Sequence, residues 1–341
     1  MKRYRVCVIG CSPSRGSQHV DAFLRNGDRF EVVGICDRDP GRLNAVGEQF
    51  NLDCRYDNAE AMLAKLKPDV LCFITMPSIR LEMVELGIRH GVKAIAYEKP
   101  MATNWPEACA IHRAVTRAGV KTIQSHQHKY GRHWQRARAL IADGQIGDLR
   151  FVHATSKGPM LHYASHLMDY SMFLSGQEAV KWVVGHAHGQ QKIDATHPAP
   201  EYMLGRYEFA NGLPGQIECG SLAPSLPPGD NQFWYDAGVC VYGTHGTVLV
   251  VSGSGLWAKV KGSDELVRDE ATFDVMLDQP PYIRELADWL DDDKKIHSCN
   301  GERAFRGFEV FMAACLSAAE KRRIDLPMEQ DVDVQALLQK A

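Results

Sequence analysis

Short apolar runs alternate with longer amphipathic segments through the first part of the chain. Unbroken runs rich in valine and isoleucine predict buried strands, and apolar residues at helical spacing predict helices. The predicted strands are 4–10, 30–36, 69–75, 91–97 and 120–124. Helices are predicted between them, most clearly at 79–90 and 107–118. Buried strands that alternate with helices indicate a doubly wound parallel sheet, so we expect an α/β Rossmann domain at 1–124.

The pattern changes after residue 124. A predicted helix at 134–142 is followed by strands with glycine and proline between them. These strands are 150–154, 180–187, 202–209, 215–219 and 239–251. Successive strands without intervening helices indicate an α+β domain with a large, mainly antiparallel open sheet, which we place at 125–301. The last amphipathic helix and the tail, 302–341, are expected to pack back on the Rossmann domain.

Composition excludes several classes of protein. A chain of 341 residues suits two domains, and its net charge of −3 gives no electrostatic basis for binding nucleic acid. The first strand begins too early for a signal peptide, and no apolar run approaches the ~20 residues of a membrane span. Ten cysteines are scattered without a C-x-x-C pair, so we expect them to be reduced. These features predict a cytoplasmic protein that binds no membrane.

The turn after the first strand has the features of a dinucleotide site. Strand, glycine-bearing turn and helix start bring backbone N–H groups and the positive end of a helix dipole to a pyrophosphate. The glycine pattern is incomplete, because Ser12 takes the place of the middle glycine. The turn residues expected to hold the cofactor are Gly10, Ser12, Ser14, Arg15 and Gly16.

Asp37 and Arg38 end the second strand, where an acidic residue hydrogen-bonds a ribose hydroxyl in dinucleotide-binding folds. Asp37 favours NAD, because its charge would repel a 2′-phosphate. Arg38 keeps NADP open, because a guanidinium can pair with that phosphate.

A charged tripeptide, Glu98-Lys99-Pro100, ends the strand at 91–97. Open α/β sheets bind ligands at the carboxyl ends of their strands, so this tripeptide marks a ligand crevice. For the tripeptide taken alone, a surface ion pair that closes a loop is an equal alternative.

Taken together, these features resemble the Gfo/Idh/MocA oxidoreductases, the group that includes glucose–fructose oxidoreductase and myo-inositol dehydrogenase. The segments that carry the resemblance are the Gly10 turn with His19, Asp37-Arg38, Thr75-Met76-Pro77, Glu98-Lys99-Pro100, 143–148, 165–169 and 242–246. The resemblance implies a pyridine-nucleotide enzyme acting on a secondary alcohol of a sugar, polyol or glycoside, and a homodimer or homotetramer. It adds His19, Thr75, Pro77, Glu98 and Lys99 to the expected cofactor contacts.

Lys99 and His166 are the candidate catalytic residues. Removal of hydride from a secondary alcohol leaves a proton on the oxygen, so the site needs a base and a positive group near the hydroxyl. Lys99 is expected to polarise the oxygen, since an apolar pocket beside NAD⁺ would lower its pKa from ~10.4. His166 is expected to accept the proton, because imidazole titrates nearer neutrality. Taken alone, His166 could equally be a satisfied core residue.

His162, His166 and Asp169 share one face of the segment 160–174 at helical spacing. Many relatives carry an aspartate where this chain has His162, which leaves the substrate class open. Two histidines do not orient each other as a carboxylate orients imidazole, so Asp169 or a substrate hydroxyl is expected to orient His166. His162 and Asp169 are both candidate substrate contacts.

Three further residues are candidate substrate contacts. His128 and Tyr130 are expected to line the substrate pocket, with ordinary loop exposure as the alternative. Trp234 could stack on a sugar ring, with a core or interface role equally open. The histidines show no metal-site motif beyond one helical pair, so no functional metal is expected.

Three functions follow from these features. The leading hypothesis is an NAD-dependent dehydrogenase that oxidises a ring hydroxyl of a sugar, inositol or glycoside. The second is redox-neutral glycoside cleavage, in which transient oxidation beside the anomeric carbon permits elimination and His162 acts as an extra base. The third is a non-catalytic protein that senses NAD(H), against which the presence of both Lys99 and His166 argues.

Overall fold

The computed structural model describes residues 2–189, 199–226, 234–329, 332–334 and 336. The described residues form two compact units. The first consists of Met1–Ala102, Cys109–Gln127 and Val275–Glu302. The second consists of Thr103–Ala108, His128–Asp274 and Arg303–Ala341.

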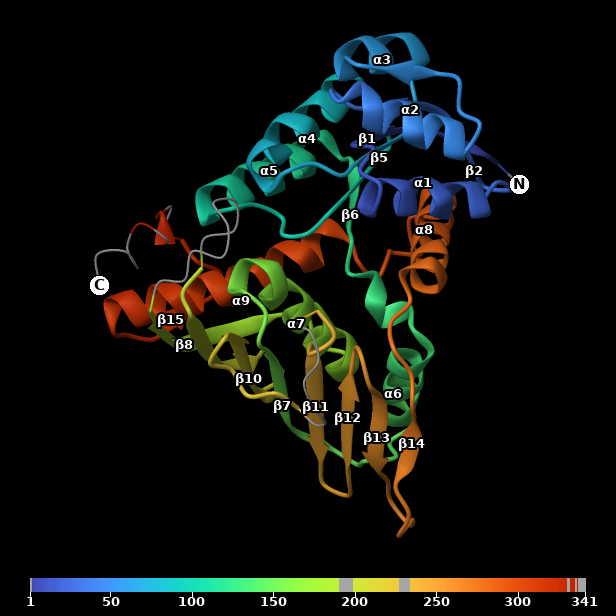
Figure 1. Cartoon of the computed structure of the whole chain (residues 1–341). Coiled ribbons are helices and arrows are strands. Elements are labelled where there is room, and N and C mark those ends of the chain that lie inside the picture. Colours follow the sequence, from blue (N-terminus) through green and yellow to red (C-terminus); the bar gives the residue numbers. More distant parts are fainter. Residues whose placement is uncertain (1, 190–198, 227–233, 330–331, 335, 337–341) are drawn as a thin grey trace. The chain divides into compact units, whose positions relative to one another are not determined.

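Within the described residues, the first unit contains a sheet of six parallel strands in the order β3-β2-β1-β4-β5-β6 (Figure 1). The strands are β1 (Tyr4–Ile9), β2 (Phe30–Cys36), β3 (Arg55–Tyr56), β4 (Val70–Phe73), β5 (Ala94–Tyr97) and β6 (Lys121–Gln124). The helical segments between them are α1 (Arg15–Arg25), α2 (Pro40–Gln49), α3 (Ala59–Leu66), η1 (Pro77–Ile79), α4 (Arg80–Arg89) and α5 (Trp105–Ala118). This order confirms the doubly wound fold, and the strand order reverses between β1 and β4, where such sheets bind ligands.

The described part of the second unit contains a sheet of nine strands in the order β14-β13-β12-β11-β7-β10-β9-β8-β15. The strands are β7 (Leu149–Ser156), β8 (Val180–His188), β9 (Tyr202–Phe209), β10 (Pro214–Gly220), β11 (Gly238–Gly243), β12 (Thr247–Val251), β13 (Gly255–Lys259), β14 (Val267–Asp269) and β15 (Ile324–Asp325). Neighbouring strands are antiparallel except β7 and β10, which are parallel. The mainly antiparallel sheet is therefore confirmed.

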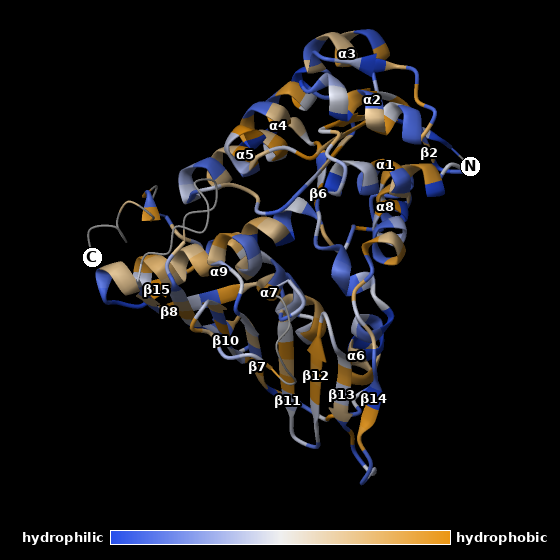
Figure 2. Ribbon diagram, viewed as in Figure 1, coloured by the Kyte–Doolittle hydropathy of each residue, from blue (hydrophilic) through white to orange (hydrophobic). Residues whose placement is uncertain are grey.

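The helical segments of the second unit are η2 (Gln127–Tyr130), α6 (Arg132–Ala142), α7 (Met160–Ser175) and α9 (Gly301–Glu320). Helix α7 is buried along nearly its whole length and packs on β7, β10 and β11. Figure 2 shows both hydrophilic and hydrophobic residues along α4, α5 and α9, as expected for helices that bury one face.

Helix α9 differs from the expectation that the C-terminal helix packs on the Rossmann domain. From Arg303 onward it belongs to the second unit, where Ser317 Oγ accepts a hydrogen bond from the Gly185 N–H at 2.9 Å. Gly185 and Gly205 are paired on β8 and β9, and a Cβ on Gly185 would lie 1.9 Å from the Ala314 carbonyl oxygen. This pair of glycines lets the helix approach the second sheet closely.

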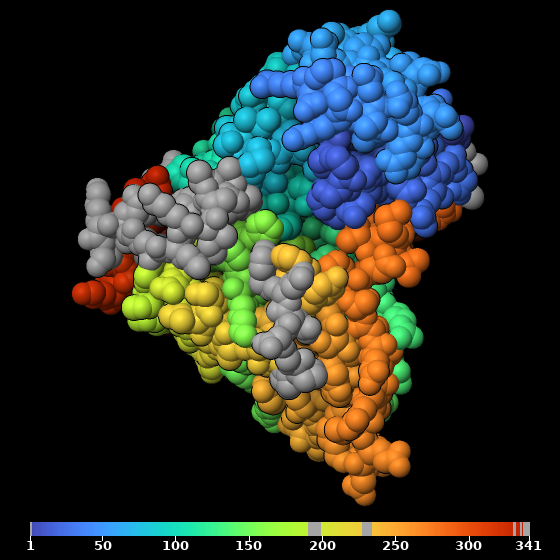
Figure 3. Space-filling model, viewed as in Figure 1, coloured from blue at the N-terminus to red at the C-terminus, as the bar shows by residue number. Residues whose placement is uncertain are grey.

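Helix α8 (Val275–Asp291) belongs to the first unit. It packs on α1, and its orange surface adjoins the blue surface of that helix in Figure 3. The buried Arg29 forms an ion pair with Asp288 at 3.0 Å, and Asn26 donates to the Pro280 carbonyl oxygen at 2.9 Å. The first unit therefore includes a segment that the expected boundaries assigned to the second domain. Among the described helices, none has the length and apolar character needed to cross a membrane.

Candidate active site

The turn between β1 and α1 is closely packed around two glycines. Gly10 has a φ of +96°, and a Cβ there would lie 2.2 Å from the carbonyl oxygen of Ile74. A Cβ on Gly16 would lie 2.4 Å from the Gly10 carbonyl oxygen. The Ser12 hydroxyl accepts a hydrogen bond from the Gly16 N–H at 2.8 Å, while Ser14 is exposed just before α1. The glycines therefore keep strand, turn and helix start as close as a complete fingerprint would.

Asp37 follows β2 and is tied to this turn. One of its carboxylate oxygens accepts a hydrogen bond from the Cys11 N–H at 2.7 Å, and Arg38 beside it is exposed. Thr75 is half-buried after β4, and Pro77 is buried at the start of η1. These residues stand at the carboxyl ends of their strands, so the turn and Asp37 fit a dinucleotide.

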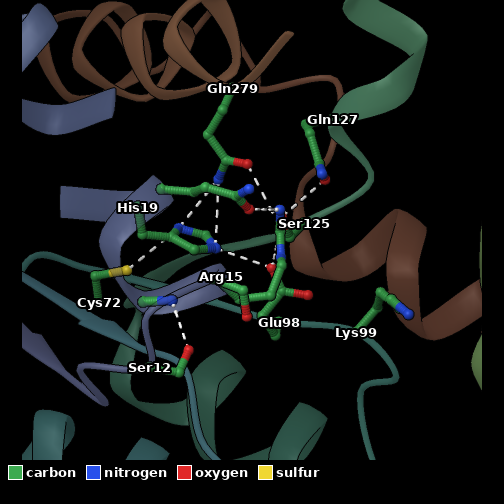
Figure 4. A network of polar contacts seen from close by, with 12 residues as sticks. Ser12, Arg15, His19, Cys72, Glu98, Lys99, Ser125, Gln127 and Gln279 are labelled. Carbon is green, nitrogen blue, oxygen red and sulfur yellow. Dashed lines mark hydrogen bonds and ion pairs between the residues drawn. The ribbon is translucent and has the colours of Figure 1, made fainter. Parts of the chain in front are cut away.

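Glu98 is the centre of a buried network (Figure 4). Arg15 forms an ion pair with Glu98, His19 Nε2 lies 2.9 Å from the same carboxylate oxygen, and Gln279 Nε2 lies 3.0 Å from His19 Nδ1. Burial alone raises the pKa of Glu98, but Arg15, His19 and Lys99 outweigh it and hold the pKa well below its usual value. Glu98 therefore carries a negative charge inside the unit.

His19 is fully buried within this network, and burial lowers the pKa of its imidazole. His19 stays a predicted cofactor contact. Its contacts are with Glu98, Gln279 and the Cys72 thiol, so it supports the site through Glu98.

Lys99 follows Glu98 directly, and its amine lies away from the hydrogen bonds of the network in Figure 4. Burial lowers the pKa of Lys99 to about 8; Glu98 opposes this shift, while Arg15 and Arg80 add to it. Arg80 begins α4, is only 2% exposed, and donates from Nη2 to the Lys99 carbonyl oxygen at 3.0 Å. A lysine that titrates near neutrality is suited to hydrogen bonding or proton exchange with a substrate oxygen.

His166 lies among aromatic rings in the second unit. Its Nδ1 lies 3.0 Å from the hydroxyl of Tyr170, one turn further along α7. The ring of His128 stacks on it with centroids 5.2 Å apart, and Phe273 stacks on His128 at 4.1 Å. Both histidines are buried, so the structure brings two of the predicted residues together.

Asp169 is engaged by cations instead of by His166. The ammonium of Lys129 lies 2.9 Å and 2.8 Å from its two carboxylate oxygens, and Arg303 Nε lies 3.4 Å from one of them. The side chains of Lys129 and Asp169 are 1% and 3% exposed. The carboxylate of Asp169 is thus the counter-ion of a buried lysine, and its expected contact with His166 or the substrate stays a prediction.

The remaining candidate substrate contacts are more accessible. Tyr130 and His162 are half-buried, and Trp234 is 39% exposed. The Trp234 ring lies 6.3 Å from Tyr235, whose ring lies 5.0 Å from Phe273. A row of rings therefore connects Trp234 with His128 and His166. The part of the chain that the structure describes has no cluster of three or more His, Cys, Asp or Glu suited to a metal ion.

Several residues of the site were not expected from the sequence. Tyr170 stands four residues after His166, so helical spacing could have indicated it. Arg80 lies next to a segment that was singled out, without a pattern that marks it. Lys129 belongs to the segment expected to line the pocket, and no sequence signal indicated its pairing with Asp169. Gln279 reaches the network from α8, far along the chain, so no local signal could have found it.

The fold and the β1–α1 turn define a dinucleotide-binding protein, and comparison with known families extends this result. Residues 4–126 match the model described as "Oxidoreductase family, NAD-binding Rossmann fold". Residues 134–249 match the "GFO/IDH/MocA C-terminal domain". Together these matches span more than half of the chain, which belongs to the Gfo/Idh/MocA family of oxidoreductases. The resemblance seen in the sequence is confirmed, and the first unit contains an NAD-binding domain.

Individual relatives are more distant. The chain is 24% identical to D-glucoside 3-dehydrogenase of Escherichia coli (strain K12) over 240 residues, which are 61% of this chain and 67% of the relative. It is 33% identical to D-apiose dehydrogenase of Paraburkholderia graminis over 147 residues, 43% of this chain and 38% of the relative. The match thus spans well under half of the second relative.

A solved structure shows the same fold. An oxidoreductase from Agrobacterium radiobacter, in complex with NAD⁺, L-tartaric acid and magnesium, superimposes with a TM-score of 0.77. The two proteins are 20% identical, and the match covers 95% of this chain and 98% of the other. At this identity the likeness concerns the fold.

Proposed function

We propose that the protein is a dehydrogenase that oxidises a secondary ring hydroxyl of a sugar, inositol or glycoside with NAD. The observation that carries the proposal is the half-buried Lys99, whose pKa is lowered to about 8 at the carboxyl end of β5 in the NAD-binding domain. The names of the relatives support the substrate class, since D-glucoside 3-dehydrogenase and D-apiose dehydrogenase act on carbohydrates.

The cofactor would be held by the Gly10–Gly16 turn, Asp37 and the Thr75–Pro77 segment, and NAD supplies the hydride acceptor when bound. The carboxylate of Asp37 supports NAD over NADP, because it would repel a 2′-phosphate. The exposed Arg38 is the group through which NADP could still bind.

Lys99 and His166 divide the work on the substrate oxygen. The Lys99 ammonium donates a hydrogen bond and stabilises the alkoxide charge that develops as the hydroxyl loses its proton. His166 accepts that proton, since imidazole is partly unprotonated near neutral pH. His128, Tyr130 and His162 contact the substrate hydroxyls, and Trp234 packs on the C–H face of the ring.

We further propose a cytoplasmic homodimer or homotetramer that assembles through the open face of the nine-stranded sheet. On this face Arg206 stacks on Phe151 at 4.5 Å, and Phe151 lies 6.0 Å from Tyr242. Val184 and Tyr242 are 44% and 40% exposed, so the face offers apolar surface to a second copy.

The test is the absorbance of reduced nicotinamide with purified protein, NAD and a panel of sugars, inositols and glycosides, with products identified by mass. A rise with one substrate and a ketone product supports the proposal. Parallel reactions with NADP test the cofactor preference. Glycoside cleavage without net NADH would indicate redox-neutral elimination, and tight NAD binding with neither product across the panel would overturn the proposed reaction.

A further inference from the structure

His166 has a neutral partner on its own helix. The hydroxyl of Tyr170 lies 3.0 Å from His166 Nδ1, within hydrogen-bond distance. Tyr170 is fully buried, and the ring of Trp134 packs 4.3 Å from its ring. The phenol is therefore held in place by packing, and it fixes the imidazole at one of its two nitrogens.

The carboxylate that follows His166 on α7 is paired with cations. Asp169, the adjacent carboxylate on α7, is engaged by Lys129 and Arg303. The titratable rings that contact His166 include those of His128, Tyr163 and Tyr170. Burial raises the pKa of Tyr163, so this phenol is uncharged. The phenols of Tyr163 and Tyr170 thus contact His166 without adding a charge.

We propose that Tyr170 is the positioning residue that prepares His166 to act as a base. In this arrangement His166 Nδ1–H donates to the Tyr170 oxygen, and Nε2 keeps its lone pair for the hydroxyl proton of the substrate. The inference rests on the proposed function, in which His166 accepts that proton.

The identity of the partner has a chemical consequence. A carboxylate at Nδ1 would stabilise the imidazolium and raise the pKa of His166. A phenol orients the ring without adding a formal charge. Tyr170 therefore supplies the orientation that a metal-free base needs and leaves His166 unprotonated at lower pH than a carboxylate would.

Tyr170→Phe tests the proposal, because it removes the hydroxyl and keeps the ring. We expect kcat to fall by about 10- to 100-fold, the usual effect of losing an orienting partner, with KM nearly unchanged. Tyr207→Phe is the matched control, since it removes another fully buried tyrosine hydroxyl from the same unit. Equal kcat in Tyr170→Phe and wild type would overturn the proposal.

His162→Asp adds a rescue experiment. The variant places a carboxylate one turn before His166, on the same face of α7. We expect it to raise the pH of the acid limb of kcat/KM and to restore part of the kcat lost in Tyr170→Phe. A purely structural role of Tyr170 does not predict the recovery of kcat, so the absence of that recovery would count against the proposal.

A spectroscopic test is independent of turnover. In protein labelled with ¹⁵N-histidine, and with His166 assigned by its loss in His166→Asn, the neutral ring should carry its proton on Nδ1. Tyr170→Phe should shift this tautomer balance. A proton on Nε2 in the wild type would overturn the inference even if the dehydrogenase assay succeeds. An Nδ1 proton with no turnover on any substrate would instead place the failure in the proposed function.

Discussion

The surroundings of Lys99 and His166 differ in charge. In the first unit, Lys99 lies beside Glu98, Arg15 and Arg80, and burial together with these charges sets its pKa at about 8. In the second unit, His166 lies among the rings of His128, Tyr163 and Tyr170. The charged Lys129 and Asp169 nearby are paired with each other. One group is tuned by formal charges, and the other is positioned by neutral contacts.

The difference in charge matches the two proposed roles, alkoxide stabilisation by Lys99 and proton acceptance by His166. A cation that stabilises a developing alkoxide must keep its proton near neutral pH while remaining desolvated, which requires a compensating anion such as Glu98. A carboxylate near a histidine base raises the pH at which the base loses its proton, and the pairing of Asp169 with Lys129 weakens that influence.

Lys99→Met should have the largest effect, because it removes the ammonium that is proposed to stabilise the alkoxide. We expect kcat to fall by about 10²- to 10⁴-fold, while NAD binds with nearly unchanged affinity. Steady-state rates and titration of NAD binding measure the two quantities. Lys93→Met is the control, because Lys93 lies at the other end of strand β5 and forms an exposed ion pair with Asp69. Substantial turnover by Lys99→Met would refute its role.

Lys129→Met breaks the charge pairing in the second unit. Loss of the ammonium removes the nearer of two cations from the buried carboxylate of Asp169 and leaves Arg303 at 3.4 Å, so the free energy of unfolding of this unit should fall by about 3 kcal/mol. Urea unfolding measures the change. Lys181→Met, which removes a half-exposed partner of Glu208, should cost less than ~1 kcal/mol. Equal losses in the two variants would show that the buried Lys129–Asp169 pair contributes no more to stability than an exposed ion pair does.

The sequence predicted the surroundings of Lys99 better than those of His166. Gly10, Asp37 and Glu98-Lys99 each follow a strand, and the parallel order of strands brings such positions to one edge of the sheet. Gln279 could not be predicted, because it reaches His19, a partner of Glu98, only through the packing of α8 on α1. The amphipathic pattern of α9 shows which face is buried but not which sheet covers it.

In the second unit, spacing along α7 placed His162, His166 and Asp169 on one face, yet it could not assign their partners. Lys129 pairs with Asp169 across 40 positions of sequence, and this pairing depends on how η2 packs on α7. Tyr170 was within reach of the same helical argument. Its role depends on Asp169 being engaged elsewhere, which only the structure shows.

Glu98→Gln tests the tuning of Lys99 from its anionic side. Because Glu98 raises the pKa of Lys99, its loss should lower that pKa below about 8. Lys99 would then lose its proton at lower pH, and the alkaline limb of kcat/KM should move down by roughly one pH unit. Glu60→Gln, at an exposed ion pair with Arg89, should leave the limb in place. An upward shift would contradict the role of Glu98.

Arg80→Met should produce the smallest effect and the opposite sign. Arg80 lowers the pKa of Lys99, so removing its positive charge should raise that pKa above about 8. The ammonium would persist to higher pH, and the alkaline limb should move up by about half a pH unit. Arg89→Met, at the exposed end of the same helix, is the matched control. If the Arg80 variant loses rate without a shift of the limb, Arg80 acts only by holding the Lys99 carbonyl, and Lys99 is tuned by burial, Glu98 and Arg15.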